Sequence, residues 1–159
     1  MNSSIMFSNN SDEWATPQAF YDEINREFGF DLDPCATDAN HKCAEYYTKE
    51  QNGLEKSWGG GRCVFCNPPY SQSAAWVRKC YEEGHKSDTV VVCLIPARTD
   101  TRYFHEYIYH RAEVRFIRGR LKFGDSKTAA PFPSMLVIWR GPDAEKRRQS
   151  NDRTRESNV

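Results

Sequence analysis

Residues 89–95 constrain the fold of this chain more than any other segment. They form a continuous run, rich in β-branched side chains and free of charged ones, that ends at Pro96. A run without polar alternation is typical of a parallel strand buried on both faces. Because parallel strands are joined by crossover helices, the run predicts an open α/β sheet with helices on both sides.

Segments with helical and strand patterns alternate along the rest of the chain. The first is a helix over residues 17–28, with Thr16 as its N-cap and Gly29 just past its end. Residues 30–33 follow as a short strand that Pro34 stops, and the polar stretch up to residue 47 leaves a second strand or only a turn open. The further elements expected are strands over residues 63–66, 113–117 and 134–139 and helices over residues 73–84 and 100–110. This alternation predicts a single open, mostly parallel sheet.

The length of 159 residues favours one domain, which we place at residues 13–141. Residues 1–12 are polar and are expected to be loose. Residues 142–159 are almost wholly polar and are expected to form a disordered tail. Since there is no apolar run of roughly eighteen residues and no signal-peptide pattern at the start, we expect no membrane contact.

The tetrapeptide Asn67-Pro68-Pro69-Tyr70 directly follows the expected strand 63–66. Open α/β sheets bind their ligands at the carboxyl ends of strands, so this loop is in position for a site. The two prolines fix the loop and aim the Pro68 carbonyl. That carbonyl and the Asn67 amide oxygen could accept the two hydrogens of a conjugated amine, while Tyr70 offers a flat face for a planar substrate. The pattern is typical of enzymes that methylate such an amine, so we take all four residues as catalytic.

The six cysteines lie mostly in apolar strand-like or helix-like stretches and are expected to be reduced core residues. Cys63 and Cys66 are three positions apart on an expected strand, whose alternation puts them on opposite faces. No second Cys pair or His pair at ligand spacing follows. We therefore expect no metal.

Methyl transfer needs a donor, and S-adenosylmethionine is the usual one. In a Rossmann-like sheet it binds past the first strand, which here ends at Asp33 and Pro34. The Asp33 carboxylate could bind the amino acid or ribose groups of this cofactor, although an Asp-Pro turn explains the pair equally well. The glycine-rich loop of a plain Rossmann fingerprint is missing from this position.

Further sequence blocks extend these motifs over the region from Trp14 to about Arg140. With them, the chain resembles the small phage-type DNA N-6-adenine methyltransferases, the Dam-like family of bacteriophages and prophages. The resemblance is carried, in order, by residues 14–17, 28–33, 46–48, 52–54, 67–70, 94–101, 119–123 and 130–134. It implies a Rossmann-like S-adenosylmethionine-dependent methyltransferase fold, the exocyclic amine of adenine in double-stranded DNA as target, and the cytoplasm of the bacterial host as location.

The resemblance also implies cofactor contacts for particular residues. They are Trp14, Thr16 and Pro17 at the methionine end of S-adenosylmethionine, Asp33 and Pro34 at its centre, and Asn52 at its adenine. Related enzymes often carry Asp where this chain has Asn52, which leaves that contact in question. The partner of the ribose stays open between Asp38 and Glu45.

Charge is distributed unevenly along the chain, although Lys plus Arg and Asp plus Glu each total 22. Residues 98–127 hold eight basic and four acidic side chains, and residues 11–58 have the opposite bias. Arginine suits phosphates and guanine edges, but a basic run is also often just a solvated face. We expect DNA contacts from Arg98, Arg118, Arg120 and Lys122, with Arg111 and Arg115 in the same basic stretch.

The sequence thus leads to a hypothesis of direct methyl transfer to an adenine flipped out of the duplex, at a cost of about a few kcal/mol. Tyr70 would stack on the base while Asn67 and Pro68 accept the amine hydrogens. The alternatives are methylation of a protein glutamine, methylation of cytosine N-4, and a DNA-binding protein that has lost catalysis. The intact tetrapeptide argues against the last of these.

Overall fold

The computed structural model describes residues 14–124 and 128–157, so the expected loose segment 1–12 lies outside the described residues. The larger sheet has four strands in the order β3 (Cys63–Cys66), β4 (Val90–Pro96), β6 (Ser134–Arg140) and β5 (Glu113–Phe116). β4 pairs in parallel with β3 and antiparallel with β6, and β5 is antiparallel to β6. The run at residues 89–95 therefore lies in an inner strand, β4, and β6 is reversed relative to the other three strands.

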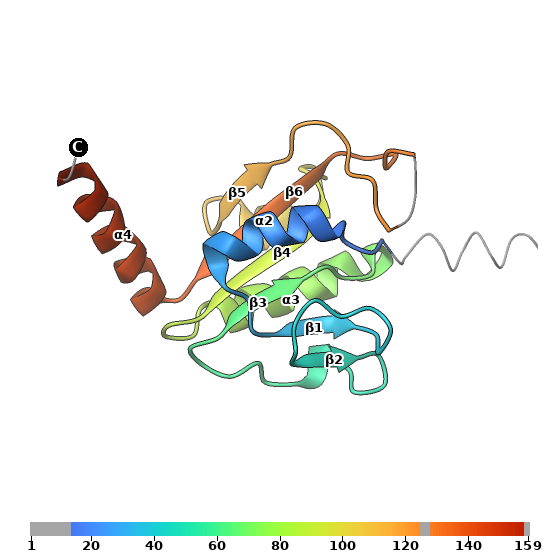
Figure 1. Cartoon of the computed structure of the whole chain (residues 1–159), viewed down its shortest axis with the longest axis horizontal. Helices are drawn as coiled ribbons and strands as arrows, with labels where there is room; N and C mark the ends of the chain where they lie inside the picture. Colours follow the sequence, from blue (N-terminus) through green and yellow to red (C-terminus); the bar gives the residue numbers. More distant parts are fainter. Residues whose placement is uncertain (1–13, 125–127, 158–159) are drawn as a thin grey trace, which may run out of the picture.

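The expectation of a single, mostly parallel sheet is not confirmed. β1 (Asp33–Ala36) and β2 (Tyr46–Thr48) form a separate two-stranded parallel sheet, which lies beside β3 in Figure 1. A parallel bridge between Leu32 and Val64 links the two sheets. Pro34 has no N–H to donate, which limits the hydrogen bonds that β1 can make to a neighbouring strand.

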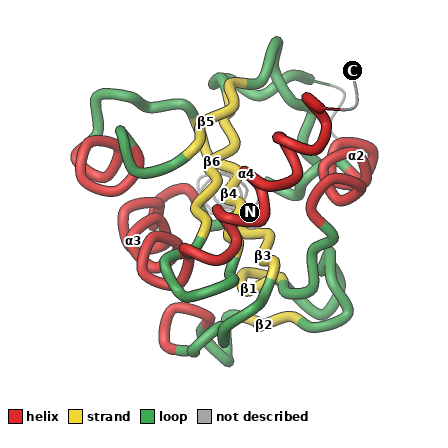
Figure 2. Tube along the Cα trace, turned by 90° about the vertical axis from the view of Figure 1, so that its left-hand side faces the viewer, coloured by secondary structure: helices red, strands yellow, loops and turns green. Residues whose placement is uncertain are grey.

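Helices cover both faces of the four-stranded sheet, as the sequence predicted (Figure 2). One face packs against α2 (Gln18–Phe28), and its core residues include Tyr21, Ile24, Phe65, Val92 and Leu94. The other packs against α3 (Ser73–Gly84), and its core residues include Trp76, Val77, Cys80, Val91, Cys93 and Ile95. Successive residues of β4 thus enter opposite cores, which explains why its sequence shows no polar alternation.

Two elements differ in their bounds from the sequence expectation. The first strand begins at Asp33 instead of ending there, because the two residues before it form hydrogen bonds with β3. Asp31 N donates to Cys63 O at 2.8 Å, and Leu32 O accepts from Phe65 N at 3.0 Å. The helix expected over residues 100–110 contains a π-helix, η3 (Phe104–Ile108). Short 3₁₀ helices, η1 (Gly53–Glu55) and η2 (Tyr70–Gln72), follow β2 and β3.

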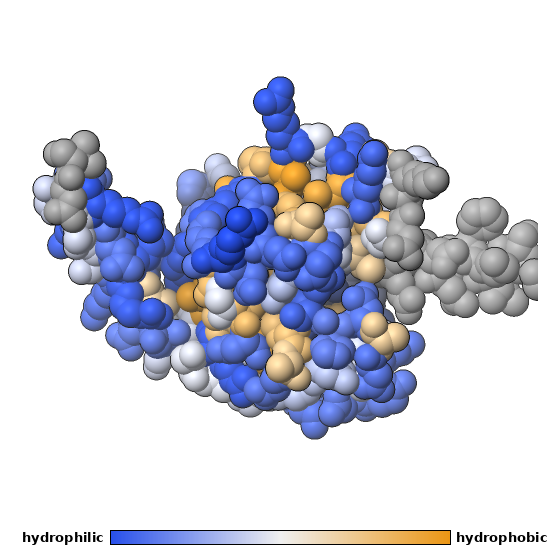
Figure 3. Space-filling model, in the orientation of Figure 1, coloured by the Kyte–Doolittle hydropathy of each residue, from blue (hydrophilic) through white to orange (hydrophobic). Residues whose placement is uncertain are grey.

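The polar stretch expected to be disordered contains a helix, α4 (Pro142–Ser157), of which Ala144 is the buried residue. Arg148 pairs with Glu145 and Asp152 at helical spacing, and such charge pairs stabilise a helix that has no apolar face. Its visible surface in Figure 3 is hydrophilic. None of the helices within the described ranges is long and apolar enough to cross a membrane.

Candidate active site

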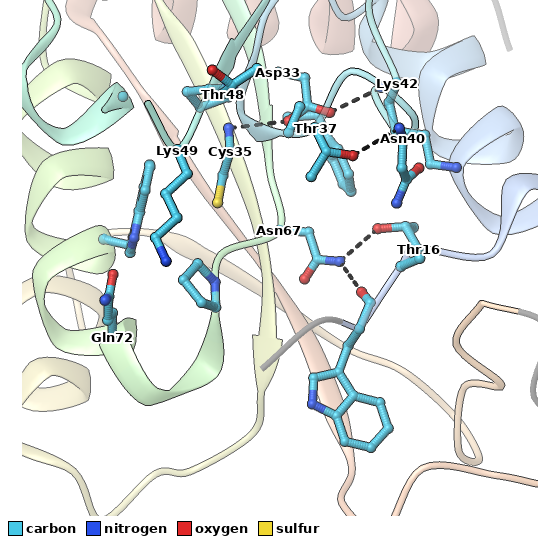
Figure 4. Close-up of a pocket in the computed structure, with 18 of the residues that line it drawn as sticks. Thr16, Asp33, Cys35, Thr37, Asn40, Lys42, Thr48, Lys49, Asn67 and Gln72 are labelled. Carbon is cyan, nitrogen blue, oxygen red and sulfur yellow. Dashed lines mark hydrogen bonds between the residues drawn. The ribbon is translucent and has the colours of Figure 1, made fainter. Parts of the chain in front are cut away.

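A pocket of about 540 Å³ opens where β1, β2 and β3 end (Figure 4). Its volume lies within the range of about 300–1,000 Å³ that is usual for small-molecule sites. The residues assigned from the sequence that line it are Trp14, Thr16, Asp33, Pro34, Asn52, Asn67 and Pro69. Pro17, Pro68 and Tyr70 lie next to these residues in the chain but outside the lining of the pocket.

The side-chain amide of Asn67 is held in one orientation by the segment that leads into α2. Its Nδ2 donates to the backbone oxygen of Trp14 and, at 2.9 Å, to Oγ1 of Thr16 (Figure 4). A backbone oxygen can only accept, so the nitrogen must face Trp14 and the amide oxygen must face the other way. Thr16 therefore does not cap α2 with its side chain, as the sequence had suggested; it binds Asn67 instead.

The amide oxygen of Asn67 accepts a hydrogen bond from the hydroxyl of Tyr70 at 2.9 Å. Burial raises the pKa of Tyr70, so this phenol stays protonated and acts as a donor at neutral pH. The ring of Tyr70 meets Phe132 edge-on, with centroids 5.5 Å apart, and Phe123 at 6.3 Å. Trp14 contacts the same two phenylalanines at 5.2 and 5.5 Å, so four aromatic rings gather beside the Asn67 amide.

Asp33 is buried, and both of its carboxylate oxygens accept backbone hydrogen bonds. Oδ1 accepts from Cys35 N at 3.3 Å and Oδ2 from Lys42 N at 3.0 Å. The carboxylate thus closes the loop between β1 and β2 while it also lines the pocket. Burial raises the pKa of Asp33 above its ordinary value, and the two N–H donors oppose this shift in part.

Asn52 and Gly53 shape the adjacent wall for reasons of backbone geometry. Asn52 adopts a left-handed conformation with φ 55°, which Asn tolerates better than most residues, and its Oδ1 accepts from Leu54 N at 3.2 Å. A Cβ at Gly53 would lie 2.2 Å from the backbone oxygen of Pro34. Glycine is therefore required for the close approach of this turn to β1.

The two candidates for a ribose partner lie outside this pocket. Asp38 accepts a hydrogen bond from Tyr46 at 2.8 Å, and Glu45 forms a two-pronged ion pair with Arg62. Both line a separate, more polar surface pocket.

Sequence reasoning missed several residues that line the main pocket: Cys35, Thr37, Asn40, Lys42, Thr48, Lys49, Gln72 and Trp76. Four of them lie in β1 or in the loop that follows it, on the side of the strand end that an open α/β sheet presents to its ligand. This topological rule could have indicated them without any motif. Lys49 extends into the pocket on the side of Gln72 (Figure 4), and Lys42 Nζ donates to Gln18 at 2.8 Å.

The basic residues assigned to DNA are exposed at the same rim as the tetrapeptide. Because β3, β4 and β5 share one direction, Asn67, Arg98 and Arg118 follow strands that end on the same side. The chain then returns to the pocket, since Gly124 N donates to Ala15 O at 2.7 Å. The exposed basic residues for which the sequence predicted DNA contacts are Arg98, Arg118, Arg120 and Lys122. Arg120 also has a partner within the protein, since its Nη1 donates to Ala130 O at 3.3 Å.

Two other arginines of the basic stretch have structural partners. Arg115 forms a two-pronged ion pair with Glu27 at 2.7 Å and a further ion pair with Glu113. Arg111 lies over the ring of Tyr81 at 5.9 Å. Arg115 therefore links β5 to α2, and Arg111 contacts α3 through Tyr81.

Comparison with known proteins identifies the family to which the chain is similar. The profile of the DNA N-6-adenine-methyltransferase (Dam) family matches residues 3–157. The DNA N-6-adenine-methyltransferase of Escherichia phage T1 is 32% identical over 111 residues, which cover 69% of this chain and 46% of that protein. That of Haemophilus phage HP1 (strain HP1c1) is 31% identical over 136 residues, covering 80% and 78%.

The chain thus spans about half the length of the phage T1 protein and most of the phage HP1 protein. Among solved structures, a protein from Pyrococcus horikoshii is similar with a TM-score of 0.42 at 15% identity, over 62% of this chain and 51% of that one. The family profile, in contrast, extends over nearly the whole chain. The chain belongs to the DNA N-6-adenine-methyltransferase (Dam) family.

Proposed function

We propose that this protein transfers a methyl group from S-adenosylmethionine to the exocyclic amine of adenine in double-stranded DNA. The observation that carries the proposal is the fixed amide of Asn67, whose oxygen faces away from Trp14 and Thr16 and lies beside the aromatic rings. A fixed acceptor stabilises the charge that grows on the amine nitrogen as it attacks, without reorganisation during the reaction.

The residues of the pocket fit S-adenosylmethionine in size and chemistry. Trp76, Pro34 and Phe65 give it an apolar wall, and the close contact of Gly53 with Pro34 keeps the neighbouring turn compact. The polar groups that would hold the methionine and nucleoside parts are Thr37, Asn40, Lys42, Lys49, Asn52 and the Asp33 carboxylate. When bound, the cofactor supplies an electrophilic methyl group on a sulfonium.

The protein residues then act on the amine and on the base. The Asn67 oxygen and the Pro68 backbone carbonyl accept the two amine hydrogens, so that the nitrogen lone pair becomes available for attack. The hydroxyl of Tyr70 donates to one lone pair of the Asn67 oxygen at 2.9 Å, and the second lone pair accepts the amine hydrogen. The ring of Tyr70 stacks on the flipped base, and Phe132 and Phe123 support it edge-on.

A nucleic acid substrate is favoured over a protein glutamine by the exposed arginines at the same rim as Asn67. Incubation with tritiated S-adenosylmethionine and either duplex DNA or a bacterial protein extract separates these substrates. We expect label in DNA, recovered as N-6-methyladenine after digestion to nucleosides. Label recovered only in protein or as N-4-methylcytosine would replace this proposal with one of the alternatives.

The mechanism is tested by Asn67→Ala, which removes the acceptor while leaving Pro68 and Tyr70 in place. Loss of one such fixed group typically lowers the rate roughly a hundred- to a thousandfold, and we expect a loss of this size in methyl transfer. Calorimetry should find S-adenosylmethionine affinity largely retained in the folded variant. A turnover close to that of the parent would contradict the assigned role of Asn67.

A further inference from the structure

Three cysteines meet in the core directly beneath the tetrapeptide. Cys66 is the last residue of β3, Cys93 is its parallel partner on β4, and Cys80 lies on α3 above both. All three are fully buried, and their sulfur atoms lie within 4.8 Å of one another. They form no disulfide.

The geometry of the sulfur atoms suits a single soft metal ion. An ion about 2.3 Å from each of three thiolates separates the sulfur atoms from one another by about 4 Å. This separation lies within the observed limit of 4.8 Å, so one ion could reach all three sulfur atoms. Thiolates select soft cations over magnesium and calcium.

We propose that Cys66, Cys80 and Cys93 form a three-sulfur binding site for a soft, thiophilic dication. Each sulfur donates a lone pair to the ion, and each thiol proton is released to solvent as the bond forms. The site differs from the Cys63–Cys66 pair considered in the sequence, because two of its ligands come from β4 and α3. Strand pairing and helix packing created it, and no spacing motif encodes it.

The three thiols differ in the direction in which their surroundings shift the pKa. Burial raises the pKa of the Cys66 and Cys80 thiols, whereas at Cys93 burial is outweighed by S–H donors from the other two, which lower the pKa. Cys35 lines the pocket and packs against the core cluster that contains the three cysteines.

Cadmium is a suitable probe because its bonds to thiolates produce charge-transfer absorption in the ultraviolet. Reduced protein under anaerobic conditions should take up one cadmium ion per chain, with this absorption and with release of protons. Cys80→Ala should lose the absorption, and Cys93→Val should do so independently if the first variant folds poorly. The matched control is Cys63→Ala, which removes a cysteine outside the trio and should bind like the parent.

Refolding from urea in the presence of cadmium tests the site even if burial slows access of the ion. Absence of the charge-transfer absorption after refolding, or equal absorption in the parent and in folded Cys80→Ala, would overturn the proposal. This binding test does not depend on the proposed enzymatic function. If that function also holds, occupancy should slow methyl transfer, because Cys66 is joined directly to Asn67.

Discussion

The amide of Asn67 donates to the hydroxyl oxygen of Thr16 at 2.9 Å, although 51 positions separate the two residues in the sequence. Thr16 is buried, and its neighbour Trp14 accepts the second amide hydrogen. The segment before α2 therefore sets the direction of the Asn67 oxygen. We infer that Thr16 is a positioning residue for catalysis in addition to lining the pocket.

Thr16→Val keeps the shape of the side chain and removes its hydrogen-bond acceptor. We expect the turnover number to fall roughly tenfold, the size of one such bond, with a smaller change in S-adenosylmethionine affinity. Thr16→Ser keeps the acceptor and should restore most of the turnover. Steady-state kinetics with calorimetric cofactor binding checks this, and a loss confined to cofactor affinity would return Thr16 to a role in cofactor binding alone.

The contact between Asn67 and Thr16 also marks the limit of what the sequence could predict. The run in β4 and the spacing in α3 predicted those elements because each pattern is local and reflects burial. The tetrapeptide at residues 67–70 was predicted as a site from the hydrogen-bond acceptors and the aromatic ring that it carries. Its supporting contacts join segments that are distant in the chain, so no local pattern encodes them.

The division into two sheets and the helical state of α4 were missed for different physical reasons. Pro34 was interpreted as the end of a strand, whereas it lies inside an irregular one at the edge of the small sheet. The polar composition after Gly141 was interpreted as disorder, although charge pairs such as Arg148 with Glu145 also stabilise an exposed helix. Composition alone does not distinguish an exposed helix from a disordered segment.

Tyr70 carries two separable functions, a hydroxyl bonded to Asn67 and a ring beside Phe132. Tyr70→Phe removes the first and should lower methyl transfer by less than about tenfold, the value of one hydrogen bond. Tyr70→Ala removes both and should weaken productive binding of the base by roughly 5- to 150-fold, as expected from loss of one stacking contact. Steady-state kinetics of methyl transfer to duplex DNA compares the two variants. Equal losses of activity in Tyr70→Phe and Tyr70→Ala would mean that the hydroxyl, not the ring, is essential.

Asp33 should make the stability of the fold depend on pH. Its pKa in the folded protein is raised by burial above the ordinary value of 3.8, so the folded state binds this proton more tightly than the unfolded state does. The free energy of unfolding should therefore fall as pH rises from 3.8 to the raised value. Urea denaturation across this range, compared with Asp33→Asn, which cannot titrate, measures the effect; parallel curves would contradict it.

The same position tests the cofactor assignment at neutral pH. Asp33→Ala removes the acceptor of Cys35 N and Lys42 N, and we expect it to lower both stability and S-adenosylmethionine affinity. Calorimetry on the folded variant separates the two effects. An unchanged affinity would leave Asp33 with loop closure alone.

The exposed arginines at the rim should carry much of the DNA binding. Arg118 and Arg120 lie on the segment that follows β5 and returns to the pocket through Gly124, and both are exposed. Each lost phosphate contact should reduce the slope of log affinity against log salt by about one, whereas loss of a base contact should cost roughly 1–3 kcal/mol and relax sequence preference. Measurement of DNA affinity at several salt concentrations for the Arg118→Ala, Arg120→Ala double variant distinguishes these outcomes.

A matched control is the double variant Arg153→Ala, Arg155→Ala, which removes two exposed arginines from α4, away from the pocket rim (Figure 1). It has the same change in net charge, so any general electrostatic effect appears in both variants. We expect the rim variant to bind and methylate DNA more weakly than the α4 variant at about 150 mM salt, where distant charges are screened. Equal behaviour of the two variants would mean that residues 118–122 are a solvated surface and that DNA is held elsewhere.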